Sequence, residues 1–360
     1  MANHRSILLI YTGGTIGMVE NPASGALEAL DFTYLYDNVP ELRRIGCEIS
    51  VEQLTPPIDS SAITPQIWEQ IATIIETNYD LFDGFVVLHG TDTMSYTASA
   101  LSFMLEGLSK PVVFTGSQLP IGKLRTDGKE NLITAIEIAA ATLPDGQPRV
   151  PEVTIFFENY LMRANRACKV SADQFNAFAS FNYPELAYAG IDIRYNDKMI
   201  YREEKPRGLK VNKDFDPNVV ILKLFPGITP EVVEAILGVP RLKGVVLETF
   251  GSGNAPKADW FIEALSRALA RGVVIVNVTQ CPRGYVDMGR YATGHGLQEI
   301  GLVSGFDSTT EAALTKLMHL IGLGYSSEQI RELMGCSLRG EISIDGAHES
   351  FYHGIFKQRG

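Results

Sequence analysis

One pattern recurs along the first half of the chain: a short, continuous apolar run, then a glycine-containing turn that carries hydroxyl groups, then a stretch with helical spacing. The apolar runs are 7–11, 85–88 and 112–114, and the turns that follow them are 12–15, 89–92 and 115–117. An apolar run without polar alternation is typical of a strand buried on both faces. Strands that alternate with helices predict a parallel sheet in an α/β fold.

The segments between these runs have the apolar spacing and composition of helices. They are 65–78, 93–106 and 131–141, and a further strand is expected at 153–157. In parallel sheets of this kind, ligands bind beyond the carboxyl ends of the strands. Because all three hydroxyl-bearing turns directly follow strands, the sequence predicts a ligand site at that edge.

The character of the chain changes after residue 190. Residues 191–200 have the pattern of a hairpin, and 201–216 are charged with few apolar residues. The α/β rhythm then restarts, with strands expected at 219–224, 244–247 and 273–278 and helices at 230–237, 258–271 and 309–321. A chain of 360 residues is long for a single core. We therefore expect an N-terminal α/β catalytic domain at 1–195, an interdomain connection at 196–217 and a smaller C-terminal α/β domain at 218–360.

Composition excludes several classes of function. The formal net charge is −11 and no window carries a run of Lys and Arg, so a nucleic-acid or membrane partner is not expected. No apolar run approaches the roughly 18 residues of a membrane span. The six histidines and four cysteines form no metal-binding pattern. With no Cys-x-x-Cys and no export signal, reduced thiols and a cytoplasmic location are the expectation.

The first glycine turn contains a candidate nucleophile. Hydrolysis of an amide requires an activated nucleophile, stabilisation of an oxyanion and groups that hold the substrate. Thr15 follows Gly13 and Gly14, whose missing side chains let backbone N–H groups approach a ligand closely. A plain tight turn is the alternative. A nucleotide site is disfavoured, because neither G-x-G-x-x-G nor a P-loop Gly-Lys-Ser/Thr is present.

The second turn and a later lysine add a candidate base. Asp92, beside Thr91, has an alternative interpretation as a helix N-cap. Lys169 follows two arginines and could be an exposed surface charge. However, a lysine next to a carboxylate can activate a hydroxyl when it is deprotonated. The coincidence with Thr15 at one sheet edge favours catalysis.

Together these segments resemble the bacterial-type L-asparaginases, and most closely their cytoplasmic type I branch. The matching motifs run in the same order across essentially the whole chain. They are Thr12-Gly13-Gly14-Thr15-Ile16-Gly17, Asp59-Ser60-Ser61 with Thr64-Pro65, His89-Gly90-Thr91-Asp92-Thr93-Met94, Asn165-Arg166 through Lys169, Gly251-Ser252-Gly253-Asn254-Ala255-Pro256, and Thr279-Gln280-Cys281.

The resemblance implies a fold, an activity and an assembly. The fold is a larger N-terminal domain with a flavodoxin-like parallel sheet and a smaller C-terminal α/β domain. The activity is hydrolysis of L-asparagine to L-aspartate and ammonia through a threonine acyl-enzyme. The assembly is a dimer of dimers with sites between subunits, and no metal or organic cofactor is implied.

The resemblance also implies roles for particular residues. Thr15 would attack the amide carbon, and Thr91 would be activated by Lys169 with support from Asp92. Backbone N–H groups of the Thr91 turn would form the oxyanion hole. Substrate-binding residues would be Asp59, Ser60, Ser61, Thr91, Asp92 and Asn254, with Asp92 on the α-ammonium and the serines on the α-carboxylate.

Two departures from the family pattern stand out. Many members carry a tyrosine on a mobile flap about ten residues after the nucleophile, whereas residues 19–27 contain none. Type I enzymes can also carry a separate asparagine effector site, here corresponding to Cys168, Glu248, Asn254 and Cys281. Glu248 stands where an arginine is expected.

Three other functions are alternatives to the asparaginase. The amidotransferase subunit of tRNA-dependent glutamine synthesis shares the fold, but normally has an additional N-terminal domain and would favour a more basic surface. A non-catalytic amino-acid sensor would explain the missing tyrosine, although the candidate catalytic residues are all present. A nucleotide-binding module is the weakest of the three, because a phosphate-binding lysine and a ribose carboxylate are both missing at suitable spacing.

Overall fold

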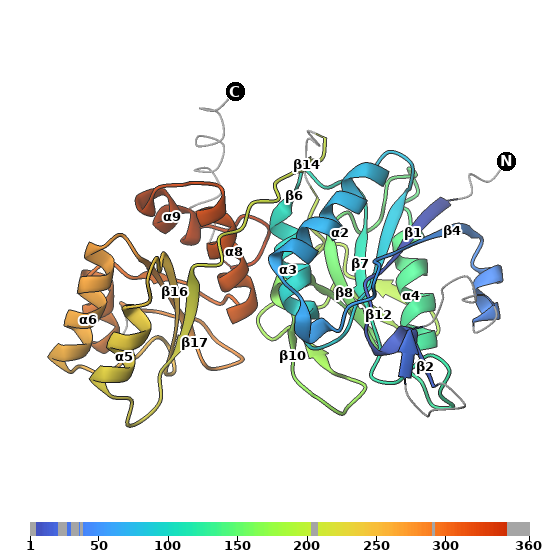
Figure 1. The fold of residues 1–360 in the computed structure, drawn as a ribbon. Helices are drawn as coiled ribbons and strands as arrows, with labels where there is room; N and C mark the ends of the chain where they lie inside the picture. Colours follow the sequence, from blue (N-terminus) through green and yellow to red (C-terminus); the bar gives the residue numbers. More distant parts are fainter. Residues whose placement is uncertain are drawn as a thin grey trace. The chain divides into compact units, whose positions relative to one another are not determined.

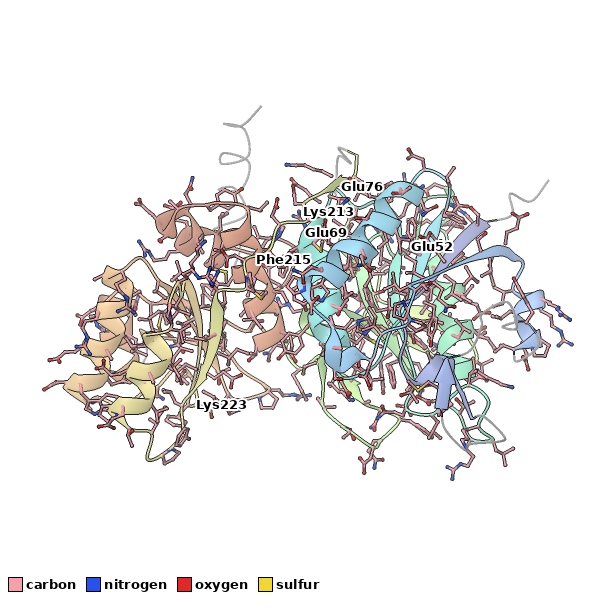
Figure 2. The ribbon with its side chains drawn as sticks, in the orientation of Figure 1. Glu52, Glu69, Glu76, Lys213, Phe215 and Lys223 are labelled. Carbon is pink, nitrogen blue, oxygen red and sulfur yellow. The ribbon has the colours of Figure 1, made fainter. Side chains whose placement is uncertain are left out.

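The computed structural model describes residues 5–20, 27–29, 36, 39–202, 208–289 and 292–343. The chain divides into two compact units, Met1–Lys213 and Asp214–Gly360 (Figure 1). The boundary falls inside the expected connection 196–217. Strand β14 (Lys210–Val211) still belongs to the first unit, because it pairs with β6 (Leu105–Glu106). Lys213 also forms an ion pair with Glu76 of helix α2 (Pro65–Asn78) at 2.6 Å (Figure 2).

The first unit is built on an eight-stranded sheet of order β13-β12-β9-β8-β7-β5-β1-β4 among the described residues. Neighbouring strands are parallel from β4 through β1, β5 and β7 to β8. These strands are β1 (Arg5–Tyr11), β4 (Cys47–Gln53), β5 (Gly84–Leu88), β7 (Val112–Thr115) and β8 (Val153–Phe157). Their order is that of flavodoxin-like sheets, so the predicted fold class is confirmed.

The remaining strands extend one edge of the sheet in antiparallel fashion. They are β9 (Tyr160–Arg163), β12 (Ala187–Ala189) and β13 (Ile193–Tyr195). The hairpin expected at 191–200 is therefore misplaced, because β13 pairs with the preceding β12. Strand β4 was missed altogether. All of its residues are exposed or half-buried, as suits the edge of a sheet, and they do not form an apolar run.

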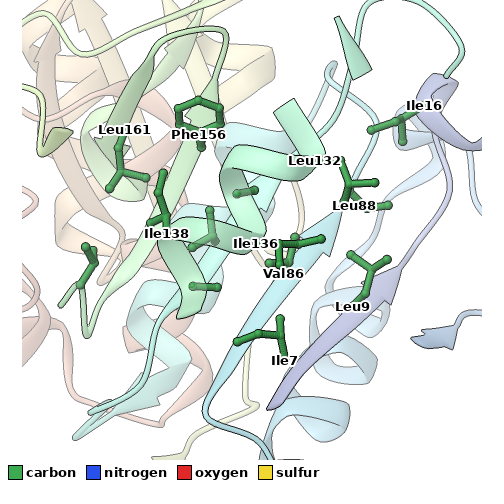
Figure 3. Close-up of a cluster of buried hydrophobic side chains, with 14 of the residues drawn as sticks. Ile7, Leu9, Ile16, Val86, Leu88, Leu132, Ile136, Ile138, Phe156 and Leu161 are labelled. Atoms are coloured by element: carbon green, nitrogen blue, oxygen red, sulfur yellow. The ribbon is translucent and has the colours of Figure 1, made fainter. Parts of the chain in front are cut away.

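Helices cover both faces of this sheet (Figure 1). Helix α4 (Gly128–Ala140) packs Leu132 and Ile136 onto alternate strand residues such as Ile7 and Val86 (Figure 3). Helices α2 (Pro65–Asn78) and α3 (Met94–Met104) pack against each other, and α3 also packs on β8. Almost every residue of α3 is buried. The period-two alternation of the strands places their remaining apolar residues on the face opposite α4.

The second unit repeats the architecture on a smaller scale. Its sheet has the order β15-β16-β17-β18, and all of its strand pairs are parallel. Val245 and Leu247 pack in the core with helices α5 (Pro230–Leu237) and α6 (Asp259–Ala270), whereas Val246 packs with α8 (Thr310–Gly322) and α9 (Ser327–Met334). The elements are β15 (Val219–Lys223), α5 (Pro230–Leu237), β16 (Gly244–Thr249), α6 (Asp259–Ala270), β17 (Val274–Thr279), α7 (Ala292–Glu299), β18 (Val303–Ser304), α8 (Thr310–Gly322) and α9 (Ser327–Met334).

Short elements complete the first unit: β2 (Met18–Glu20), β3 (Leu27–Ala29), β10 (Cys168–Lys169), β11 (Phe178–Ala179), and the 3-10 helices η1 (Thr15–Gly17), η3 (Pro40–Arg44), η4 (Ser60–Ala62) and η5 (Ala164–Arg166). Strands β2 and β3 pair antiparallel where the flap was expected. Residues 21–26 of that flap lie outside the described residues. In the described part of the chain, no helix is long and apolar enough to span a membrane.

Candidate active site

The two threonine turns follow adjacent strands at the switch point of the sheet. Within the eight-stranded sheet, the next strand along the chain after β1 is β4, which lies on one side of it. The strand after that is β5, which lies on the other side of β1 and leads on to β7. Ligands of doubly wound sheets bind at the carboxyl ends of the strands where the order reverses in this way. Thr15 lies after β1 and Thr91 after β5, so both turns meet at this position.

Hydrogen bonds hold the segments after β1, β4 and β5 together. Both the backbone N–H and the hydroxyl of Thr12 donate to the Leu88 carbonyl at 3.0 Å. The Ile58 N–H donates to the Thr12 carbonyl at 2.8 Å. The hydroxyl of Thr93 donates to the carbonyl of Ser60 at 2.7 Å. Hydrogen bonds to main-chain carbonyls, two of them donated by threonine hydroxyls, therefore determine how the three loops lie.

Glycines allow these loops to approach one another closely. Gly14 has a φ of 90°, and a Cβ there would lie 2.5 Å from the Gly90 Cα. A Cβ on Gly90 would lie 2.5 Å from the Ser60 Oγ. Either distance is far below van der Waals contact, so a side chain at Gly14 or Gly90 would separate the loops. The loops of Thr15, Ser60 and Thr91 thus form one site.

Lys169 connects two of the predicted residues. Its Nζ lies 2.8 Å from the Thr91 Oγ1 and 2.6 Å from the Asp92 Oδ1. The Lys169 side chain is 19% exposed, whereas that of Asp92 is 64% exposed. The ammonium therefore lies below the carboxylate and beside the threonine hydroxyl. This geometry allows a proton to pass between Thr91 and Lys169 with Asp92 compensating the charge.

Gln118 was missed by sequence reasoning. The Thr91 hydroxyl donates to the Gln118 Oε1 at 3.3 Å, and the Gln118 Nε2 donates to the Gln174 carbonyl at 3.0 Å. The backbone N–H of Gln118 is in turn held by Asp127 at 2.9 Å. A signal for Gln118 was present in the sequence, because the third hydroxyl-bearing turn, residues 115–117, ends directly before it.

The predicted substrate loop forms the 3-10 helix η4. Asp59 caps it by accepting a hydrogen bond from the Ser61 N–H at 2.8 Å. Hydrogen bonds from Ser61 lower the pKa of Asp59 below its ordinary value. Ser60 is buried and Ser61 is exposed. Of these three residues, Ser60 packs against the Thr91 turn, where its side chain lies directly beside Gly90.

The remaining predicted residues are divided between the two units. Cys168 precedes Lys169 in β10, and its thiol lies 3.6 Å from the Ala179 carbonyl. In the second unit, Glu248 lies in β16 and Cys281 follows β17. Asn254 closes a turn after β16, and its N–H donates to the Phe250 carbonyl at 2.8 Å. None of Cys47, Cys168, Cys281 and Cys336 forms a disulfide. Among the described residues, no group of three His, Cys, Asp or Glu side chains is placed to hold a metal ion.

Comparison with protein families assigns both parts of the chain. Residues 6–201 match the family described as asparaginase, N-terminal, and residues 218–334 match the glutaminase/asparaginase C-terminal domain. The chain belongs to the asparaginase family. The resemblance read from the motifs is thereby confirmed.

Similar proteins cover almost the whole asparaginase chain. L-asparaginase 1 of Escherichia coli strain K12 is 44% identical over 349 residues, covering 95% of this chain and 99% of that protein. The crystal structure of L-asparaginase I from Vibrio cholerae matches with a TM-score of 0.87 at 44% identity, covering 95% of this chain and 100% of that chain. A 60 kDa lysophospholipase from Mus musculus is 42% identical, covering 96% of this chain and 64% of that protein.

Proposed function

We propose that this chain hydrolyses L-asparagine to L-aspartate and ammonia. The observation that carries the proposal is the contact of Lys169 with both Thr91 and Asp92, in a loop that lies against the Thr15 loop. Two hydroxyls, a carboxylate and a lysine that acts as a base in its deprotonated form lie at one sheet edge, and together they supply the nucleophile and base that amide hydrolysis requires. The proposal agrees with the chain's membership of the asparaginase family.

In the proposed reaction, the Thr15 oxygen attacks the side-chain amide carbon. The Thr15 hydroxyl proton passes through the Thr91–Lys169 pair, with Lys169 in its neutral form, to the amide nitrogen; the C–N bond then breaks and the nitrogen departs as ammonia. Water then attacks the resulting ester and releases L-aspartate and free Thr15. In the structure the Thr91 hydroxyl donates to Gln118. It must therefore rotate toward Lys169 before it can transfer its proton.

The substrate's charged ends require complementary groups. We assign the α-ammonium to Asp92, whose carboxylate is exposed, and the α-carboxylate to the loop of Asp59, Ser60 and Ser61. Asn254 is assigned to the site from the second domain. The scheme requires no metal or organic cofactor. We further propose a dimer of dimers located in the cytoplasm, in keeping with the free cysteines.

Ammonia release measured with several substrates tests the proposal. We expect turnover of L-asparagine, weaker or no turnover of L-glutamine, and none of D-asparagine. A lysophosphatidylcholine arm is included because one relative is named a lysophospholipase. Ester cleavage in that arm, without ammonia release from L-asparagine, would refute the assignment. Failure to turn over any amide would favour the amino-acid sensor.

The substitution Lys169→Met tests the proposed base. We expect kcat to fall about a hundredfold while KM changes little, because general-base assistance acts in the transition state. Steady-state kinetics with L-asparagine measure both constants. Lys110 provides a matched control. Its ammonium donates to the Phe82 carbonyl at 2.8 Å, and it precedes strand β7, at the opposite edge of the sheet from the threonine turns. Wild-type kinetics after Lys169→Met would return Lys169 to the role of a surface charge.

Glu248 leads to a prediction about regulation. Its carboxylate accepts a hydrogen bond from the Thr310 hydroxyl at 2.6 Å and forms an ion pair with Lys223 at 3.2 Å. An arginine here would attract an effector carboxylate, whereas two carboxylates about 4 Å apart repel by roughly 4 kcal/mol at an effective dielectric near 20. Lys223 reduces that repulsion. Allosteric couplings are only about 1–3 kcal/mol, so even a reduced repulsion would cancel them.

We therefore expect a hyperbolic dependence of rate on L-asparagine. Rates over a hundredfold range of substrate concentration measure it. A Hill coefficient above about 1.5, where independent sites give one, would show that an effector site persists with other ligands.

A further inference from the structure

His89 opens the catalytic turn but lies beneath it. It directly follows β5, and its side chain is completely buried. Its backbone N–H donates to the Thr115 carbonyl at 2.9 Å, and its ring lies 6.1 Å from that of Phe114. The imidazole therefore belongs to the core of the sheet, and the proposed reaction leaves it without a role.

The single polar contact of the ring determines its tautomer. The His89 Nδ1 lies 2.7 Å from the Gly90 carbonyl oxygen. A carbonyl can only accept, so Nδ1 carries the proton and Nε2 is the basic nitrogen. Burial lowers the pKa of His89 to about 4, against a smaller opposing effect of the Gly90 bond. At neutral pH the ring is therefore an uncharged donor to Gly90. The structure records no partner for Nε2 among the described residues.

This contact orients the peptide that joins Gly90 to Thr91. A trans peptide is planar, and its C=O and N–H point in opposite directions. In the described part of the chain the only cis bond is Thr55-Pro56. Because the Gly90 carbonyl points to the buried ring, the Thr91 N–H points away from it. No hydrogen bond from this N–H to a described residue is recorded.

Glycine makes such a restraint necessary. Residue 90 must be glycine because a Cβ would collide with Ser60. Glycine also has the widest choice of backbone conformations, so the peptide after it is easily rotated. If that peptide flipped, a carbonyl dipole would replace the N–H and would repel a developing oxyanion. The hydrogen bond from His89 opposes that flip.

We propose that neutral His89 is a positioning residue, which holds the Gly90–Thr91 peptide with the Thr91 N–H directed at the oxyanion of the reaction. The inference rests on the proposed amidase function. It predicts that the Nδ1 donor matters for kcat and that the rest of the ring does not. Loss of one oxyanion donor typically lowers kcat by about 10²–10³.

The test compares His89→Asn with His89→Gln and His89→Leu. An asparagine amide nitrogen occupies about the position of Nδ1, whereas a glutamine amide nitrogen extends to about that of Nε2. We expect kcat for L-asparagine to stay within about tenfold of wild type in His89→Asn. In His89→Gln and His89→Leu it should fall at least about a hundredfold, with KM within about threefold. Rates are expressed per folded protein, from urea unfolding of each variant.

His319 offers a matched control in the second unit. It is also buried, its Nδ1 contacts the Asp214 carbonyl at 3.0 Å, and burial lowers its pKa to about 4. His319→Leu should reduce stability but leave kcat within about twofold of wild type.

Three results would overturn the inference: equal losses of kcat in all His89 variants, losses that appear mainly in KM, or wild-type kcat in His89→Leu. A wild-type enzyme that releases no ammonia would instead refute the proposed function. The variants would then be compared on whichever substrate the enzyme cleaves, where the same ranking is expected.

Discussion

Replacing Thr15 with alanine should lower kcat for L-asparagine by at least about a thousandfold, because removal of a covalent nucleophile removes the acyl-enzyme route. The fold should survive, since Thr15 is only half-buried, at the start of the short 3-10 helix η1 at the sheet edge. Ammonia release measures the loss, and Thr15→Ser, which keeps a hydroxyl, should retain far more activity. More than about a tenth of wild-type kcat in Thr15→Ala, a barrier change below about 1.4 kcal/mol, would contradict the assignment.

The same prediction extends to Thr91. Thr91→Ala should lose most of its turnover, because Lys169 then has no hydroxyl with which to exchange a proton. The double variant should be little worse than either single one, since residues that act as a unit fail together. Additive losses would mean that Thr15 and Thr91 act in separate steps.

The largest expected loss of stability follows from a buried ion pair in the second unit. Lys316 of α8 lies 2.7 Å from Glu341, and the two side chains are 2% and 1% exposed. The carboxylate also accepts the N–H groups of Leu338 and Arg339, and the ammonium donates to the Cys336 carbonyl. The pair thus fastens the segment after α9 to α8. Lys316→Met should reduce the free energy of unfolding by about 3–5 kcal/mol, because it leaves a buried carboxylate without its cation.

A double-mutant cycle and a pH series check this prediction. Lys316→Met with Glu341→Gln should cost less than the two single changes added together. Burial raises the pKa of Glu341, but Lys316 and the N–H donors outweigh burial and hold it below the ordinary value. Without Lys316 burial dominates, and the folded pKa lies above the unfolded one. The difference in the free energy of unfolding between wild type and Lys316→Met should therefore shrink as the pH falls into the range where the Glu341 carboxylate becomes protonated. Equal unfolding energies of Lys316→Met and wild type would show that the pair contributes nothing.

Local pattern was enough to predict most helices and strands. Continuous apolar runs placed β1, β5, β7 and β8 within a few residues, because strands buried on both faces have no polar alternation. Edge strand β4 and helix α9 were missed. Helix α9 is capped by Ser326 and Gln329, a local signal that was present in the sequence.

Local sequence patterns were sufficient to predict the fold class and to name candidate groups for the site, because apolar periodicity and the types of turn residues are local properties of the chain. Which of these groups meet depends on the tertiary fold. Lys169 reaches Thr91 across 78 positions of sequence, Gln118 reaches it across 27, and His89 is turned inward to the Gly90 carbonyl. These contacts depend on strand order and on glycines without side chains at the crossing of two loops. Such distances arise only when the whole sheet has packed, since each is the sum of many non-local contacts.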